Sequence, residues 1–377
     1  MRATLLFSLF LFGLSVVGQD TRITKDFNES FTTKDIRLLE IENKYGDVII
    51  NTWKYDSVKI VVAVEAFGKT QELANREISK VDVKIRRVGS MITAVTTFEQ
   101  IKSKGFFGEL LSEIEDVSKS FVGNSKLTID YEVWMPTYME LNLNNKYGDA
   151  FVGQLKGNAR ITLAHGDLRA DQMLGEIHLD HSFGKHTINL LNNGYLTLRG
   201  VTSDISKANK LSFESSSSQI YLGKIDELKL DNRNDKLLVD EAKTVSGNGS
   251  FTDLTVKKLS HNSRLDFSYG EIYLDQILKN FEYIRIDGKS TDINLIINQG
   301  SYIKTYIEGD QAQVQSQMIL PNSMLTMNRQ PLQESDRISL TGMVGNTQVE
   351  VSDLYINTDQ GSLIISIEET DMFTNKD

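Results

Sequence analysis

The stretch that decides the fold reads Leu-Asn-Leu-Asn-Asn-Lys-Tyr-Gly-Asp-Ala-Phe-Val and occupies residues 141–152. Apolar residues occupy every second position before its Tyr-Gly-Asp turn, with asparagine between them, and again after it at Ala150 and Val152, which predicts short strands with one row of side chains facing inward. With Gly148 as the centre, apolar residues lie seven and five positions before it and two, four and seven positions after it. These residues are Leu141, Leu143, Ala150, Val152 and Leu155.

The same pattern recurs through residues 139–297. Centres at Gly166 and Gly184 follow Gly148 at two equal intervals, and only His186 breaks the apolar rule in these two copies. Regular self-similarity of this kind is typical of proteins built from stacked units. The later centres are predicted at Ser203, Ser218, Asp235, Thr252, Gly270 and Thr291.

Some copies fit less well or lie further away. The fit is poorest at Ser203, where Lys207 and Lys210 would occupy apolar places. The pentapeptide Asn-Lys-Tyr-Gly-Asp at 43–47 recurs letter for letter at 145–149, which indicates an early copy about a hundred residues before the others. The outlying centres are Gly46, Asp310, Gly345 and Gly361.

A unit of this size cannot bury its inward row alone, so successive units must stack. We therefore predict an all-β fold, a right-handed single-stranded parallel β-helix with coils of about 18 residues, spaced ~4.8 Å apart. A β-sandwich or propeller is the main alternative. It would need hairpin turns at regular places, and two-residue hairpin loops are scarce in this sequence.

The chain divides into six predicted parts. The first residues combine one positive charge, a short apolar run and small residues, which is typical of a secretory signal. The run is too short to span a bilayer, so no transmembrane segment is expected after cleavage. We expect a signal peptide at 1–18, a leader at 19–35, a first β-helix coil at 36–57, a mixed α/β insertion at 58–136, the main β-helix at 137–370 and a tail at 371–377.

The insertion at 58–136 differs from the rest of the chain. Residues 70–81 are predicted to form a short helix capped by Thr70, and the residues around them read as strands. A stack of coils exposes apolar faces and strand edges at its ends. The insertion is therefore a candidate cover for the open end.

Composition excludes several classes of function. The net charge is −10, and no concentrated run of Lys and Arg is present, so a nucleic-acid partner is not expected. The chain has no cysteine, which excludes disulfides, thiolate metal sites, thiol catalysis and attachment through a lipidated cysteine. No cofactor is predicted.

The predicted turns share a small set of residue types. Glycine at the centre is expected to take a positive φ, and the aspartate after it can bind local backbone groups. The residue before the centre is often aromatic, and Tyr147, His165 and Phe183 could stack as a ladder on consecutive coils. The predicted turn and ladder residues are Tyr45, Gly46, Asp47, Tyr147, Gly148, Asp149, His165, Gly166, Asp167, Phe183, Gly184, Tyr269 and Gly270.

Two weak candidates for metal binding compete with plain structural roles. Asp149 and Asp167 would be stacked neighbours that could hold calcium, or they could be solvated turn residues. Four histidines, His165, His178, His181 and His186, fall in two predicted coils, but their spacing does not match a zinc motif. We expect His178 to point outward and His186 inward. No metal site is predicted.

Signals for catalysis are absent or non-specific. Polysaccharide lyases and hydrolases of β-helix form need convergent charged residues on one outer face, and no such set stands out. No Gly-x-Ser-x-Gly elbow occurs. Trp53 and Trp134 could be platforms for sugar rings. However, Trp53 lies seven residues after the centre Gly46, an apolar position of the pattern, which favours a core role.

The signal, the segment Glu42–Trp53, the insertion and the copies that restart at Asn145–Asp149 together resemble the putative-adhesin family of exported bacterial β-helix proteins, which carry auto-transporter adhesin head or GIN-type domains. The resemblance implies no catalytic residues. The leading hypothesis is a non-enzymatic protein that binds an envelope or surface protein or glycan and is periplasmic, outer-membrane-associated or extracellular. The alternatives are a carbohydrate-active β-helix enzyme and a structural periplasmic protein.

Overall fold

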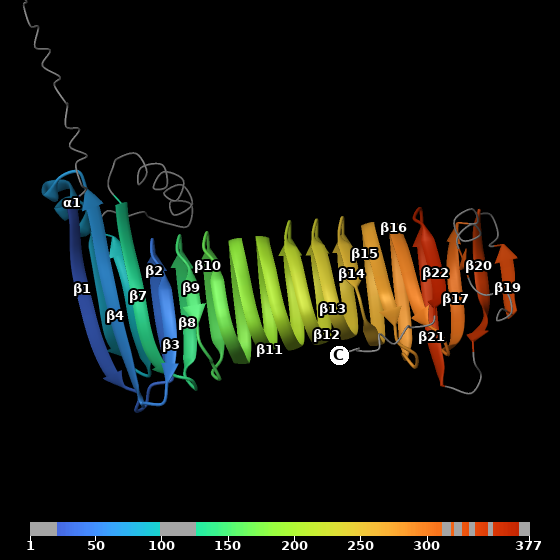
Figure 1. Ribbon diagram of the computed structural model, residues 1–377, viewed down its shortest axis with the longest axis horizontal. Helices are drawn as coiled ribbons and strands as arrows, with labels where there is room; N and C mark the ends of the chain where they lie inside the picture. Colours follow the sequence, from blue (N-terminus) through green and yellow to red (C-terminus); the bar gives the residue numbers. More distant parts are fainter. Residues whose placement is uncertain are drawn as a thin grey trace, which may run out of the picture. The chain divides into compact units, whose positions relative to one another are not determined.

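The computed structural model describes residues 21–98, 126–310, 318–319, 326–331, 336–345 and 350–368 (Figure 1). The expected signal peptide at 1–18 and tail at 371–377 lie outside the described residues. The described chain is almost entirely β, with twenty-two strands in one open sheet and the helix α1. The all-β prediction is therefore confirmed.

The chain forms two compact units. Unit 1 comprises Met1–Asp26, Ala63–Asp82 and Thr97–Ile129, and unit 2 comprises Phe27–Val62, Val83–Thr96 and Asp130–Asp377. Five strands run from one unit into the other. They are β1 (Thr21–Thr32), β4 (Ser57–Gly68), β5 (Val81–Val88), β6 (Met91–Phe98) and β7 (Lys126–Pro136). The polar segment expected only as a leader thus includes a strand.

Unit 1 contains the predicted helix. α1 spans Gln71–Ile78, and the Thr70 side chain accepts a hydrogen bond from the Leu73 backbone N–H at 3.2 Å. This N-cap satisfies a donor that the first turn leaves unpaired. Ala74 and Ile78 are buried on one face of the helix. The helix and its cap are confirmed, although the helix ends at Ile78 rather than Val81.

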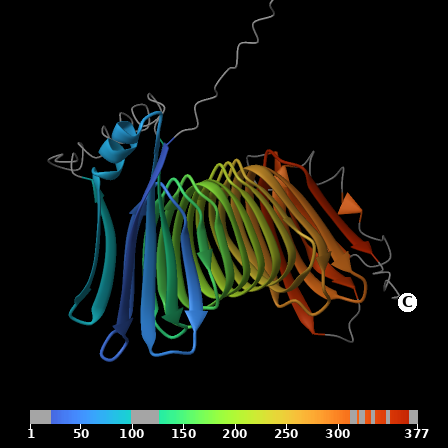
Figure 2. The same ribbon diagram turned by 60° about the vertical axis from the view of Figure 1, so that its left-hand side comes forward.

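Unit 2 contains a long series of parallel segments that lie beside one another (Figure 1; Figure 2, green to orange). Leu141 pairs with Ala159 and Ala159 with Ile177, so each step of the register equals the interval between the centres Gly148 and Gly166. The strands are β8 (Glu140–Lys146), β9 (Ala150–Val152), β10 (Ala159–Ala164), β11 (Leu168–Ser216), β12 (Gln219–Arg233), β13 (Lys236–Ser250), β14 (Asp253–Val256), β15 (Leu259–Ile277) and β16 (Tyr283–Asn298).

Side chains alternate between a buried row and an outward row along these strands. The buried row is continuous from segment to segment, because in-register pairing sets each inward side chain over its equivalent in the next segment. Leu155, Met173 and Leu191, all seven residues after their centres, are fully buried. This core holds unit 2 together without disulfides.

The centre predicted at Ser203 is wrong by two residues. Ser203 pairs with Ile220, which lies two residues after the centre Ser218, so the true centre is Val201. Gly200 takes the turn position before it, with φ +62°. Lys207 and Lys210 are accordingly exposed. The buried residues in their place are Ala208 and Leu211.

The early copy joins the series at its N-terminal end. β2 (Leu38–Lys44) pairs in parallel with β8 on one side and with β6 on the other. β3 (Val48–Trp53) pairs in the same way with β9 and β7. The first copy is therefore flanked on both sides by strands, although Leu39 and its partner Leu141 lie far apart along the chain.

The copies predicted at Asp310 and Gly345 are wrong. The strand that ends at Asp310 pairs antiparallel with the strand that ends at Gly345, and Tyr302 lies opposite Gly345. The segment centred on Gly361 pairs directly with β16, which lies much earlier in the chain. The strands concerned are β17 (Tyr302–Asp310), β18 (Met318–Ile319), β19 (Thr326–Pro331), β20 (Arg337–Gly345), β21 (Val351–Asp359) and β22 (Leu363–Glu368).

The error has a physical cause. Alternating apolar residues such as Ile303, Ile338 and Leu340 fit a strand equally well in parallel or antiparallel pairing. The spacing of two therefore identified the strands but not their partners. The chain leaves the series after β16, forms an antiparallel pair and returns.

Candidate binding surface

The turns of unit 2 place the strained backbone on the aromatic residue rather than on glycine. Tyr45, Tyr147, His165 and Phe183 have φ between +56° and +69°, whereas the glycines that follow them do not take a positive φ. The expectation that these glycines supply the positive φ is wrong. A left-handed conformation costs a non-glycine residue roughly 1–2 kcal/mol.

Glycine is required there for another reason. A Cβ atom on Gly148 would lie 1.9 Å from the Gly46 carbonyl oxygen, and one on Gly166 would lie 2.0 Å from the Gly148 oxygen. Gly184 has the same relation to Gly166, at 2.1 Å. Successive turns therefore approach each other so closely at this point that no side chain fits.

The aromatic residues form a ladder along the turns. Ring centroids are 5.5 Å apart for Tyr45 and Tyr147, 5.0 Å for Tyr147 and His165, and 5.0 Å for His165 and Phe183. Interplanar angles of 13°, 5° and 9° show that the rings are stacked. Such stacking offsets part of the backbone strain.

A second, shorter stack lies further along the chain. Tyr269 stacks on Phe251 at 5.0 Å. Phe251 was not predicted from the sequence because Thr252 rather than glycine follows it. The turn positions between the two stacks hold the small or polar residues Gly200, Ser217 and Asn234.

The aspartates after the turns bind the backbone of the next segment. The Asp149 N–H donates to Asp47 Oδ1, and the Asp167 N–H donates to Asp149 Oδ1, each at 2.8 Å. The Lys185 N–H donates to Asp167 Oδ1 at the same distance. Asp149 and Asp167, the weak calcium candidates, thus tie consecutive turns together. Within the part of the chain that the structure describes, no three His, Cys, Asp or Glu side chains are grouped to hold a metal ion.

The four clustered histidines take three different roles. His165 belongs to the ladder, and His178 points outward with Nε2 2.9 Å from Glu176 Oε1. His186 points inward and is fully buried, as is His181, whose direction was not predicted. Only His181 and His186 are brought together, and the four rings do not form one site.

His181 and His186 belong to a polar cluster inside the core. Their Nδ1 atoms are 3.2 Å apart, His181 Nε2 lies 2.9 Å from the Gly166 oxygen, and Ser203 Oγ lies 2.7 Å from His186 Nε2. Burial lowers the pKa of His186 to about 3, with a smaller lowering from His181, and burial also lowers the pKa of His181. Ser203 and His186 resemble a nucleophile and base, but neither is open to a substrate.

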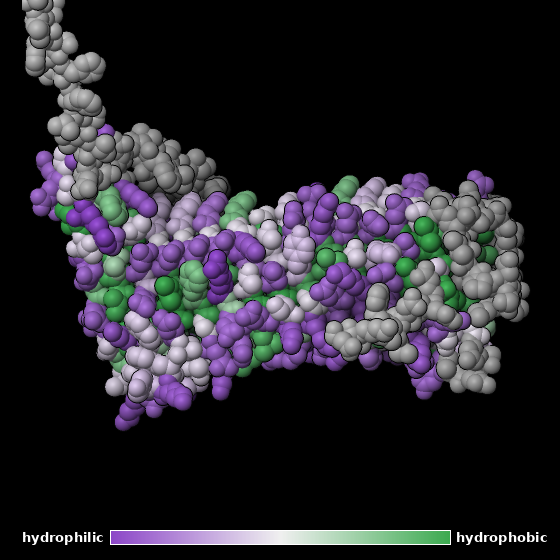
Figure 3. Space-filling model, in the orientation of Figure 1, coloured by the Kyte–Doolittle hydropathy of each residue, from purple (hydrophilic) through white to green (hydrophobic). Residues whose placement is uncertain are grey.

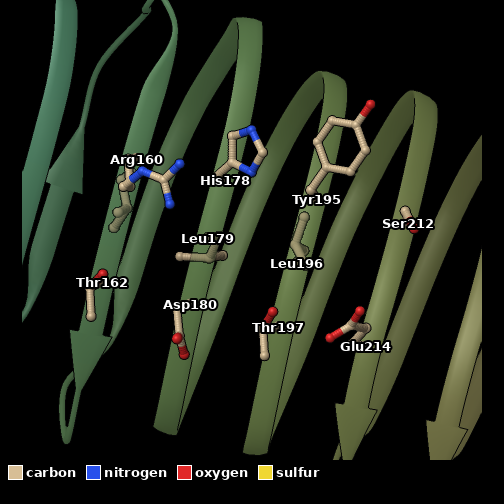
Figure 4. Close-up of a pocket in the computed structure, with 11 residues that line it drawn as sticks. Arg160, Thr162, His178, Leu179, Asp180, Tyr195, Leu196, Thr197, Ser212 and Glu214 are labelled. Carbon is tan, nitrogen blue, oxygen red and sulfur yellow. The ribbon is translucent and has the colours of Figure 1, made fainter.

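The outward rows of neighbouring segments form a shallow hollow of about 250 Å³ (Figure 4). Arg160, His178, Tyr195 and Ser212 make one row, six residues before their centres, and a second row lies two residues further along each segment. The floor consists of backbone and of the inward leucine and isoleucine residues. The full lining is Arg160, Ile161, Thr162, His178, Leu179, Asp180, Tyr195, Leu196, Thr197, Ser212 and Glu214.

The side chains that line the hollow differ in whether they have a stacking or ion-pair partner. His178 and Tyr195 stack at 5.0 Å with an interplanar angle of 15°, and Tyr195 is 50 % exposed. Asp180 forms an ion pair with Arg199 at 3.0 Å. Among the described residues, Arg160 and Glu214 have no ion-pair partner. The hollow thus offers one guanidinium group and one carboxylate without described ion pairs, together with an exposed aromatic pair.

Arg160, Tyr195 and Glu214 were not predicted as site residues. Their signal was present, because each is an outward residue next to a predicted inward one. Tyr195 could not be aligned with His178 while the centre at Ser203 was misplaced. With the centre at Val201, the two rings occupy equivalent positions.

The two tryptophans lie together at another place on unit 2. Trp53 and Trp134 have ring centroids 6.4 Å apart with an interplanar angle of 30°. Both are partly exposed. The prediction of a core role for Trp53 is therefore wrong. Trp53 is the last residue of β3, and the chain leaves the strand at Lys54.

No protein-family model matches the chain, and no curated protein matches it. Solved structures with low similarity were found. A putative adhesin from Parabacteroides merdae is 11% identical, covering 92% of this chain and 97% of that chain, with a TM-score of 0.28. A putative cell adhesion protein from Clostridium sporogenes is 8% identical, covering 92% and 100%, with a TM-score of 0.18.

A putative lipid binding protein from Parabacteroides distasonis is 10% identical, covering 91% of this chain and 97% of that chain, with a TM-score of 0.26. At TM-scores this low, none of these likenesses carries an argument about function.

Most of the visible outer face of unit 2 is polar, with smaller apolar areas between (Figure 3). In the described residues, no helix has both the length and the apolar character needed to cross a lipid bilayer.

Proposed function

We propose that this chain is an exported, non-enzymatic adhesin-like protein whose outer side surface binds a glycan at the cell envelope. The observation that carries the proposal is the hollow of Figure 4, where a stacked His178–Tyr195 pair lies among outward polar side chains. Sugars bind through ring faces on aromatic side chains and hydroxyl groups on polar ones. A hollow that crosses several equivalent segments suits an extended chain ligand better than a compact one.

The scaffold in this proposal is a right-handed parallel β-helix. In-register pairs such as Leu141 with Ala159 and Leu211 with Leu228 support coils of the predicted length. The handedness follows from the strong preference of parallel crossover connections for the right hand. In this arrangement the parts of β6 and β7 that belong to unit 2 would cover the edge of the first coil.

Export is the part of the proposal that rests on sequence alone. Residues 1–18 have the charge, apolar run and small residues of a signal peptide. The mature chain would begin near Gln19 and be periplasmic, outer-membrane-associated or extracellular. Protease treatment of intact cells, with a periplasmic protein as control, distinguishes an exposed position from an internal one.

A carbohydrate-active enzyme is the second candidate, because the hollow holds two carboxylates, Asp180 and Glu214. Glycoside hydrolysis uses a pair of carboxyl groups at a defined separation. The ion pair between Asp180 and Arg199 favours binding over catalysis, since this carboxylate is already engaged by a neighbouring side chain. Release of new reducing ends or unsaturated products from acidic or neutral polysaccharides, with and without calcium, would support the enzyme.

The binding proposal is tested with the mature chain on an array of bacterial and host glycans. We expect Arg160→Ala and Tyr195→Ala to weaken binding at least roughly tenfold, because each removes a main contact of about 1.4 kcal/mol or more. Tyr221→Ala is the matched control, since Tyr221 is an exposed tyrosine outside the hollow. Binding that survives both hollow substitutions unchanged would contradict the proposal.

A further inference from the structure

Trp53 and Trp134 are the only tryptophans of the chain, and the fold brings them together from β3 and β7, which lie far apart in the sequence. The strands pair in parallel, with Asn51 opposite Trp134 and Trp53 opposite Pro136. The rings are partly exposed and lie 6.4 Å apart. We refer to Trp53, Tyr55 and Trp134 as the aromatic cluster.

The core does not require these rings. The residues equivalent to Trp53 in the next three segments are Leu155, Met173 and Leu191, all fully buried, whereas Trp53 is not. Its indole N–H instead donates to the Ser57 carbonyl oxygen at 2.7 Å, which fixes the orientation of the ring. A fixed aromatic ring loses little conformational entropy when a ligand binds to it.

Tyr55 extends the aromatic surface toward solvent. Its ring meets Trp53 edge to face, with centroids 5.4 Å apart and an interplanar angle of 89°. The side chain is 70 % exposed, the highest value among the large exposed apolar residues that the structure describes. A tyrosine that projects in this way contributes nothing to the core, but it extends the aromatic surface beside Trp53.

Polar groups of both kinds surround the rings. Lys59 Nζ lies 5.0 Å from the Trp134 ring centroid. Asn51 and Glu132, each two residues before a tryptophan on the same outward row, approach one another with Asn51 Nδ2 3.5 Å from Glu132 Oε1. The cluster is therefore bordered by ammonium and amide donors and by a carboxylate acceptor.

We propose that the aromatic cluster is a second binding site, specific for an uncharged pyranose chain. The C–H face of a sugar ring packs on indole, and its hydroxyl groups can donate to Glu132 and accept from Asn51 or Lys59. A proline-rich peptide also binds aromatic surfaces, but proline has no N–H and would offer the Glu132 carboxylate no donor beyond the Asn51 amide. The site shares no residue with the hollow and does not depend on it.

Tryptophan fluorescence tests this site directly, because both tryptophans of the protein lie within it. The mature chain is titrated with cellohexaose, chitohexaose and maltohexaose, and with decaproline as the competing ligand class. We expect a saturable change in emission with at least one hexasaccharide and none with decaproline. Tyr55→Ala, which keeps both fluorophores, should weaken that binding roughly threefold to tenfold.

Tyr195→Ala is the control that separates the two sites, because it alters the hollow and leaves the aromatic cluster intact. It should leave the fluorescence titration unchanged, whatever its effect on glycan-array binding. Three results would overturn the inference: no emission change with any hexasaccharide, a change with decaproline alone, or equal affinity in the wild type and Tyr55→Ala.

Discussion

Gly166 shows how a single residue can be fixed by a neighbouring segment rather than by its own backbone angles. Its φ is not positive, yet a Cβ atom there would overlap the Gly148 carbonyl oxygen. The strained angle falls on His165, whose ring is stabilised by its neighbours in the ladder. Close approach of backbones and aromatic stacking thus explain the two adjacent residue types.

Gly166→Ala is expected to destabilise the fold by about 2–3 kcal/mol, since the backbone at 2.0 Å must move to admit the methyl group. Gly153→Ala is the matched control, because the nearest atom there is the Thr52 side-chain oxygen at 3.3 Å. Urea denaturation of both variants measures the difference. Equal stability of the two variants would show that the turns do not approach as closely as described.

The buried histidines predict a dependence of stability on pH. The folded pKa of His186, about 3, lies below its unfolded value of about 6.5, so the stability it confers is fully present above pH 6.5 and is lost as pH falls toward 3. His181 acts in the same direction because burial lowers its pKa, although the hydrogen bond to the Gly166 carbonyl oxygen and, less strongly, Asp167 and Asp180 oppose this. The free energy of unfolding should fall by up to about 1.4 kcal/mol per pH unit for each histidine.

His186→Leu should flatten this slope, since leucine and isoleucine occupy the equivalent inward positions at Leu168 and Ile220. His178→Leu, on the outward row, should retain the wild-type slope. Urea denaturation at a series of pH values between 7 and 4 makes the comparison. A slope in His186→Leu equal to that of the wild type would assign the acid sensitivity to groups other than His186.

At the scale of the element, alternation of apolar residues was enough to locate the strands but not always their partners. Around Gly148 and Gly166, the repeated Gly-Asp pair marks the same position in each segment. The strands pair in the register that these positions predict. Near Gly200 the turn lacks the Gly-Asp pair at its centre, and the predicted centre was two residues away from the observed one. Near Tyr302 the chain reverses direction, which depends on contacts distant in sequence.

The candidate sites were harder to predict from the sequence than the strands were. Trp53 occupies a position that the pattern makes apolar and inward, and only the pairing of β3 with β7 shows that Trp134 lies beside it. Asn232 and Asp235 form another buried polar pair, in which Asn232 Nδ2 donates to Asp235 Oδ2 at 3.0 Å. A pattern of apolar positions does not predict such a pair. Residues that depart from a pattern need three-dimensional neighbours to explain them.

The aspartate bonds between turns link one element to the next. Asp149→Ala should cost about 1 kcal/mol, because the Asp167 N–H loses its acceptor at a partly exposed site. Asp149→Asn keeps an acceptor oxygen at the same place and should cost less. Thermal unfolding of both variants tests the order. A melting temperature that rises with calcium and depends on the Asp149 carboxylate would instead favour a metal role.

At the scale of the whole molecule, both proposed sites depend on parallel segments stacked in register. The hollow exists because equivalent residues of neighbouring segments stand side by side, and the aromatic cluster exists because β7 pairs with β3. A shift of one residue in any register would turn the outward row inward. Both proposed sites therefore require the in-register parallel stack.

Engineered cysteine pairs report on this register without interference, because the chain contains no cysteine of its own. Thr162 is paired with Asp180 on one side and with Asn144 on the other, so Asn144 and Asp180 are two segments apart. We predict that Thr162→Cys with Asp180→Cys forms a disulfide on mild oxidation, measured by mass and loss of free thiol. Asn144→Cys with Asp180→Cys should not, since about 9.6 Å exceeds the reach of the bond. Cross-linking of the second pair in preference to the first would contradict the stack.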